Sequence, residues 1–84
     1  MDITDEFLIE IGKQISYLRE KNNQTLDDLE YLSGIDSSDI NKYEKGKTNL
    51  TIRNLIRISK ALNVHPKILL DFDFDFDFNK YNNE

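Results

Sequence analysis

Seven of the eleven basic residues in this 84-residue chain lie between residues 42 and 70. That stretch has a single acidic residue and a net charge of +6, whereas residues 1–41 carry −7 and residues 71–84 carry −4. Clustered cations attract polyanions, and their placement says more about partners than the overall charge of −5 does. The centre of the chain is therefore a candidate nucleic-acid surface. Its cations are Lys42, Lys45, Lys47, Arg53, Arg57, Lys60 and Lys67.

The sequence gives little support for catalysis or for metal binding. The lack of cysteine excludes disulfides, thiolate metal sites and cysteine nucleophiles. The single histidine, His65, precedes Pro66 and is better explained as a helix cap or surface residue than as a catalytic or metal-binding group. No acid pair, serine triad or phosphate-binding glycine loop stands out. We therefore expect neither an enzyme nor a protein that needs a metal or cofactor.

No membrane or export signal stands out either. No apolar run approaches the roughly 20 residues of a membrane span. The first residues, MDITDEF, are acidic where a signal peptide needs basic charge. The expected location is the cytoplasm, with no membrane contact.

Helices are expected through most of the first seventy residues, because apolar residues recur there at helical spacing. Capping residues and glycines divide the pattern into short helices, and no strand signal precedes residue 71. We expect an all-α domain over residues 1–70 and a separate tail over residues 71–84. The expected helices are 5–21 capped by Thr4, 25–32 capped by Thr25, 37–45 capped by Asp36, one that begins at Thr51, and a short one that His65 and Pro66 open.

The apolar positions also predict which side of each helix is buried. Every residue named next is expected to face the core. They are Leu26, Leu29 and Leu32 in the second helix, Ile40 and Tyr43 in the third, and Ile52, Leu55, Ile56, Leu62 and, at the margin, Ile58 in the fourth.

The helices expected at 25–32 and 37–45 are joined by about four residues that include Gly34. This is the arrangement of a helix-turn-helix, whose second helix enters the DNA major groove. Any small helical bundle can contain such a pair, so spacing alone leaves both interpretations open.

Residues 11–70 resemble the Cro and phage-repressor type of helix-turn-helix protein, often called the XRE family. The matching patterns are "IG..I..LR", "T..DL..LSGI", "I..YE.GK" and "L..I.KALNV", which fall in successive helices. The resemblance implies a five-helix lambda-repressor-like fold that binds double-stranded DNA.

The same resemblance implies roles for individual residues. At the start of the third helix and one turn later, Ser37, Ser38, Asn41 and Lys42 match positions that contact base edges. Lysine can donate to guanine O6 and N7, and asparagine can bond adenine. Contacts to the phosphate backbone are implied for Thr25, Lys45, Lys47, Asn49 and Arg53. A solvated helix start and an ordinary basic face remain the alternatives.

Three residues depart from the family pattern. Leu26 stands where the family commonly has a glutamine that clamps phosphate. Asp39 brings a carboxylate to the helix expected to read DNA, where it would repel phosphates unless it bonds a cytosine amine. Glu30 replaces a small residue near the helix crossing, so it must find a partner or lean outward. Glu44 is expected to hold the fold together rather than to contact DNA.

These features predict a transcription regulator, with repression as the expected action, that binds sequence-specifically as a homodimer on half-sites one helical turn apart. The alternative is a protein-interaction or antitoxin-like module on the same fold with weak or no DNA binding, which Leu26, Asp39 and the acidic tail favour.

The tail contains DFDFDFDF, in which phenylalanine alternates with aspartate from residue 71 to residue 78. In a β-strand, period two would place every ring on one face. We therefore expect Phe72, Phe74, Phe76 and Phe78 to close the dimer as a paired strand. Packing back onto the chain's own helices, and a disordered acidic tail that screens DNA or binds a partner protein, are the alternatives.

Overall fold

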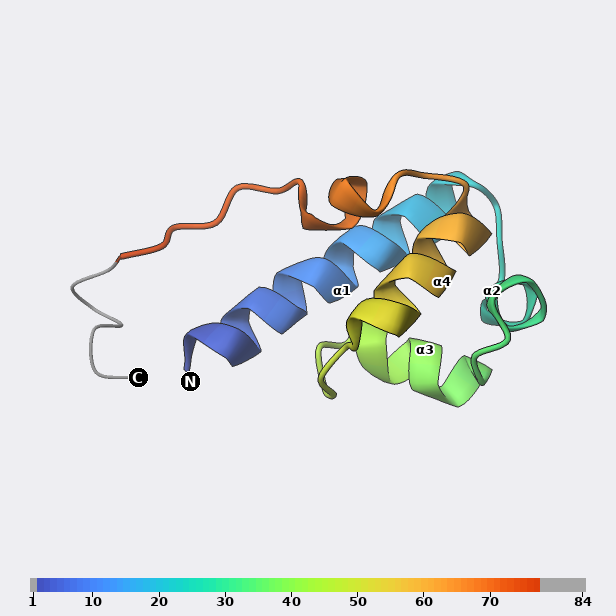
Figure 1. Ribbon diagram of the computed structural model, residues 1–84, viewed down its shortest axis with the longest axis horizontal. Coiled ribbons are helices and arrows are strands. Elements are labelled where there is room, and N and C mark those ends of the chain that lie inside the picture. Colours follow the sequence, from blue (N-terminus) through green and yellow to red (C-terminus); the bar gives the residue numbers. More distant parts are fainter. Residues whose placement is uncertain (1, 78–84) are drawn as a thin grey trace.

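The computed structural model describes residues 2–77, which form four α-helices and one short 3-10 helix (Figure 1). No strand occurs among these residues, so the expected all-α class is confirmed, with a 3-10 turn as the fifth helix. The elements are α1 (Ile3–Lys21), α2 (Leu26–Ser33), α3 (Ser37–Glu44), α4 (Ile52–Leu62) and η1 (Pro66–Leu70).

Local capping explains where most of these helices begin. Thr25 and Asp28 form a reciprocal capping box at α2, and the Thr51 hydroxyl accepts from the Asn54 N–H at α4. His65 caps η1 by accepting from the Lys67 N–H at 3.1 Å, as expected. The expected Thr4 cap is wrong. Helix α1 starts earlier, because the Asp2 carboxylate accepts from the Asp5 N–H at 2.8 Å.

The core lies where α1 crosses the other helices, and it is built from aliphatic side chains of every element. The residues with less than 2% of their surface exposed are Ile15, Leu29, Ile40, Ile58, Ser59, Leu62 and Leu69. Burying such an aliphatic side chain contributes about 1.5–3 kcal/mol. Within a domain this small, the core therefore depends on a few well-placed aliphatic residues.

Two expected buried stripes are partly wrong. In α4, Ile58 lies at the centre of the buried side, while Ile52 is 71% and Ile56 is 45% exposed. In α2, Leu29 is fully buried but Leu32 is 54% exposed. Successive residues of a helix are rotated by about 100° about its axis. The apolar side chains predicted to share one buried stripe therefore point in different directions, and only some of them face the core. Helix α4 consequently has an apolar strip that faces away from the core.

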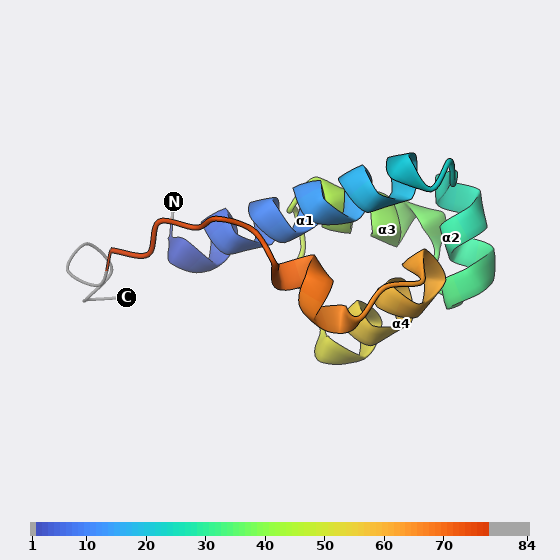
Figure 2. The same ribbon diagram turned by 90° about the horizontal axis from the view of Figure 1, so that it is seen from above.

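The tail packs back onto the protein's own first helix. Residues 71–77 run beside α1 toward its N-terminal end (Figures 1 and 2). The ring of Phe7 lies 5.2 Å from that of Phe72 and 5.0 Å from that of Phe74, between ring centroids. Gln14 donates to the Ile68 carbonyl in η1 at 2.9 Å and to the Asp71 carbonyl, at the start of this segment, at 3.4 Å. This is the second of the arrangements considered for the tail.

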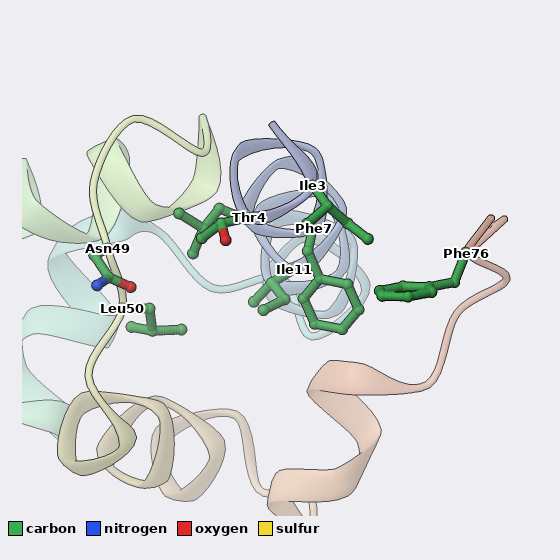
Figure 3. A pocket seen from close by; sticks show the side chains of 8 residues that line it. Ile3, Thr4, Phe7, Ile11, Asn49, Leu50 and Phe76 are labelled. Atoms are coloured by element: carbon green, nitrogen blue, oxygen red, sulfur yellow. The ribbon is translucent and has the colours of Figure 1, made fainter. Parts of the chain in front are cut away.

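Phe76 extends the aromatic cluster to the edge of an apolar groove of about 320 Å³. Figure 3 shows its ring directed toward Ile3 and Phe7, with Asn49 and Leu50 on the opposite wall. Phe78 lies outside the described residues. Dimerisation through the phenylalanines stays a prediction, because these contacts are those of a single chain.

Candidate nucleic-acid interface

Helix α3 is held against the core by its inward side. Ile40 is fully buried, as expected, and half-buried Tyr43 packs on the same cluster. The Tyr43 hydroxyl accepts a hydrogen bond from Asn54 of α4 at 2.9 Å. With this side fixed, the opposite side of α3 is presented to solvent.

The crossing of α1 and α3 is close and ion-paired. A Cβ added at Gly12 would overlap the carbonyl oxygens of Tyr43 and Glu44, so the two backbones touch here. The Arg19 guanidinium donates to both carboxylate oxygens of Glu44, at 2.6 and 3.1 Å, and to the Gln24 carbonyl at 2.9 Å. The hydrogen bond to Glu44 raises the pKa of Arg19, so the guanidinium remains charged at any ordinary assay pH. Glu44 therefore holds the fold together, as expected.

The turn between α2 and α3 is set by Gly34 and Glu30. Gly34 has φ 76°, the left-handed conformation that glycine adopts without strain. Asp36 occupies the N-cap position of α3, but its side chain makes no capping hydrogen bond. Instead the Glu30 carboxylate accepts from the Ser37 N–H at 2.6 Å. Glu30 is thus exposed and partnered, and it caps a neighbouring helix rather than its own.

Two of the four predicted base-contacting residues lie on the outward side of α3, and the other two lie on its flanks. Ser38 and Lys42 are exposed, and Ser37 and Asn41 are half-buried at the edges. At about 100° per residue, Ser38 and Lys42 point away from the buried Ile40, and Asn41 lies about 100° to one side of it. This surface presents a hydroxyl, an amide and an ammonium group within about one helical turn. Such donors and acceptors are those that distinguish base edges in a major groove.

The predicted phosphate-contacting residues lie around α3. Lys45, Lys47 and Asn49 are exposed in the segment that follows it, and Arg53 is exposed in the first turn of α4. Gly46 shapes this segment with φ 67°, where an added Cβ would come within 2.7 Å of Ile9. The remaining residue is Thr25, whose side-chain oxygen accepts from the Asp28 N–H at 3.0 Å while the hydroxyl proton stays available to donate.

Asp39 is exposed on the flank of α3 opposite the flank that carries Asn41. It lines a polar hollow of about 250 Å³ together with Asp36, Asn54 and Arg57. Arg57 lines the same hollow without forming an ion pair to Asp39 among the described residues. Arg57 was not among the predicted site residues, because only the folded chain places α4 beside the start of α3. Leu26, the third departure, is half-buried against the core.

Among the residues that the structure describes, no helix is long and apolar enough to cross a membrane. Within residues 2–77, no three histidine, aspartate or glutamate side chains gather as metal ligands.

Comparisons with known proteins agree with this geometry. A family model described as "Helix-turn-helix" matches residues 15–69. The control protein C.BamHI of Bacillus amyloliquefaciens is 32% identical over 71 residues, which are 83% of this chain and 88% of that protein. The crystal structure of the restriction-modification controller protein C.AhdI from Aeromonas hydrophila superposes with a TM-score of 0.72 at 29% identity, covering 74% of this chain and 94% of that one. The chain therefore belongs to the helix-turn-helix family of the Cro and phage-repressor type, a family of DNA-binding regulators without enzymatic activity.

Proposed function

We propose that the protein represses transcription by binding operator DNA as a homodimer in the cytoplasm, with α3 in the major groove. The observation that carries this proposal is the outward side of α3. Ser38 and Lys42 stand there, with Asn41 on one flank, on a helix whose other side is locked by Ile40 and Tyr43. A fixed helix with exposed donors can discriminate bases, because its side chains reach the groove edge in one register.

The basic surface around α3 supplies the affinity in this proposal. Lys45, Lys47, Asn49 and Arg53 contact phosphates and fix the orientation of α3 without reading sequence. Thr25 contributes from the start of α2. A two-fold dimer would place its two copies of α3 about 34 Å apart, one helical turn of DNA.

The target is inferred from the relatives' names. One is a control protein and the other a restriction-modification controller protein. We assign this chain the same kind of target, a promoter within a restriction-modification locus. Bound there, a dimer would exclude RNA polymerase from the DNA that it covers.

The test is a selection of bound duplexes from random DNA, followed by titration of the best sequence at several salt concentrations. With about three to five phosphate contacts per subunit, log K should fall against log salt with a slope of roughly −5 to −9. An enriched sequence with two-fold symmetry is expected. A tight complex whose affinity does not change with salt would contradict the proposal.

A protein-interaction module on the same fold remains the second candidate, and the acidic tail is the feature that favours it. Retention on heparin separates the two, because heparin mimics the phosphate backbone. The DNA-binding proposal requires retention at moderate salt. Two of the features that favoured the second candidate, Leu26 and Asp39, have structural explanations in core packing and in the hollow beside Arg57.

A further inference from the structure

Helix α4 has an outer face that the rest of the described chain leaves uncovered. Ile52 is 71% and Ile56 is 45% exposed, one helical turn apart. Arg53, Arg57 and Lys60 are also exposed, and together the five residues line a hollow of about 610 Å³. We call these five residues the α4 outer face. It is apolar along one strip and cationic along the next.

The charges of this face are unbalanced. The sequence of α4, IRNLIRISKAL, contains no acidic residue. Within residues 2–77, none of the three cations pairs with a carboxylate. A second α4 packed on this face by two-fold symmetry would bring like charges together, which disfavours that arrangement. The suitable occupant instead offers apolar rings and carboxylates in alternation.

The tail of this same chain has that chemistry. Asp75 and Phe76 continue an alternation of acids and rings, and residues 71–84 carry a net charge of −4. The spacing also fits. In an extended chain, residues two apart lie about 6.6–6.8 Å apart on one face. Residues four apart on a helix are separated by about 6 Å along its axis. One ring can therefore lie over Ile52 and Ile56 while the long side chain of Arg57 reaches the neighbouring aspartate.

The occupant must come from another copy of the chain. Phe72 and Phe74 of a chain's own tail pack on Phe7, and the tail continues along α1 away from α4 (Figures 1 and 2). Asp75 and Phe76 are exposed in that position, the ring by 45%. Phe76 contacts Phe74 within its own chain, and the exposed part of its ring lies beside the exposed Asp75 on the surface of the anchored tail.

We propose that the tail of one subunit docks on the α4 outer face of a second copy, with Phe76 over Ile52 and Ile56 and Asp75 beside Arg57. Each subunit gives one tail and receives one, so the contact is reciprocal and closes a dimer. This inference rests on the homodimer in the proposed function and names the surfaces that form it.

A charge exchange tests the contact. We would prepare full-length Arg57→Asp and Asp75→Arg proteins and measure their dimer dissociation constants by sedimentation equilibrium without DNA. Each variant alone places like charges at both contacts, so dimerisation should weaken by roughly tenfold. Mixed in equal amounts, the variants form a heterodimer that keeps the parent Asp75 and Arg57 at one contact. The two exchanged charges meet at the other contact, again with opposite signs. The mixture should associate nearly as tightly as the parent protein.

Matched controls make the outcome specific. Lys13→Asp reverses another exposed charge, on α1, and should leave the dissociation constant within about twofold. Circular dichroism melting of each variant shows whether the fold is kept. A contact between a tail and its own α4 would give no recovery on mixing, and that result overturns the proposal. An unchanged dimer after removal of residues 71–84 overturns it too.

The DNA experiments are independent of this test. If mixing fails to restore the dimer while operator binding is intact, the tail contact is wrong and the proposed function stands. If mixing restores the dimer but no duplex is enriched, the tail contact stands and the DNA-binding proposal fails.

Discussion

The residues around α3 fall into two groups. One group fixes α3 to the rest of the fold, and the other lies exposed on α3 and beside it, where DNA is expected to bind. Arg19 and Glu44 belong to the first group, with side chains only 15% and 8% exposed. Lys42 and Lys47 belong to the second group and are exposed. Substitutions in the two groups should therefore change different measurements, the first the free energy of unfolding and the second the affinity for DNA.

Replacing Arg19 with methionine should destabilise the fold by about 3 kcal/mol, because a largely buried carboxylate loses its partner. Urea denaturation measures this change. The double variant Arg19→Met with Glu44→Leu should recover most of the loss, since neither charge is then buried alone. If Arg19→Met costs no more than Lys13→Met, which breaks an exposed pair with Glu10, the ion pair does not hold α1 to α3.

Substitutions of Lys42 and Lys47 should change DNA binding in different ways. Lys42→Ala should cost about 1–3 kcal/mol on the preferred sequence and relax the preference at one base pair. Lys47→Ala should weaken binding to every duplex alike and reduce the salt slope by about one per subunit. Titration of each variant on the selected duplex and on a scrambled one measures both effects. Equal loss of discrimination in the two variants would contradict the assigned roles.

At the scale of elements, the sequence predicted more of the local structure than of the contacts between helices. Caps such as Thr25 and His65 depend on neighbouring residues, so their patterns are readable in the chain. Whether Ile52 and Ile56 are buried depends on which elements α4 packs against. The sequence pattern of an apolar strip is the same whether the strip is buried or exposed. The outward residues of α3 were predicted from family resemblance, because spacing alone did not separate a helix-turn-helix from any helix pair.

The role of Glu30 could not be predicted from the sequence either, because its hydrogen-bond partner lies in the next helix. Its hydrogen bond to the Ser37 N–H satisfies a donor at the start of α3, where a negative charge is also favoured. Glu30→Ala should destabilise the protein by about 1 kcal/mol, the usual value of a lost cap. Glu30→Gln keeps an acceptor oxygen and is the matched control, with a smaller loss expected. Thermal melts of the two variants give the comparison, and identical melting temperatures for parent and Glu30→Ala would refute the cap.

At the scale of the whole molecule, charge is separated along the chain. The centre carries +6 and the tail −4, so the overall charge of −5 hides the surface that we expect to face DNA. The tail is held along α1 through Phe72 and Phe74, and its aspartates are exposed there. The basic residues therefore attract the phosphates of an approaching duplex, while the carboxylates of the tail repel them.

Replacing Asp71, Asp73, Asp75 and Asp77 with asparagine tests this field, because it keeps the rings and the length of the tail while the net charge changes from −5 to −1. The association rate with a duplex that holds one half-site should rise by roughly three- to tenfold at low salt, because the repulsive charge is gone. The single half-site separates this effect from dimerisation. At high salt the two rates should converge, since charges further apart than the Debye length of about 3 Å at 1 M are screened. Stopped-flow fluorescence with a labelled duplex measures both rates. Equal association rates for the parent and the variant at low salt would mean that the tail carboxylates do not repel the DNA.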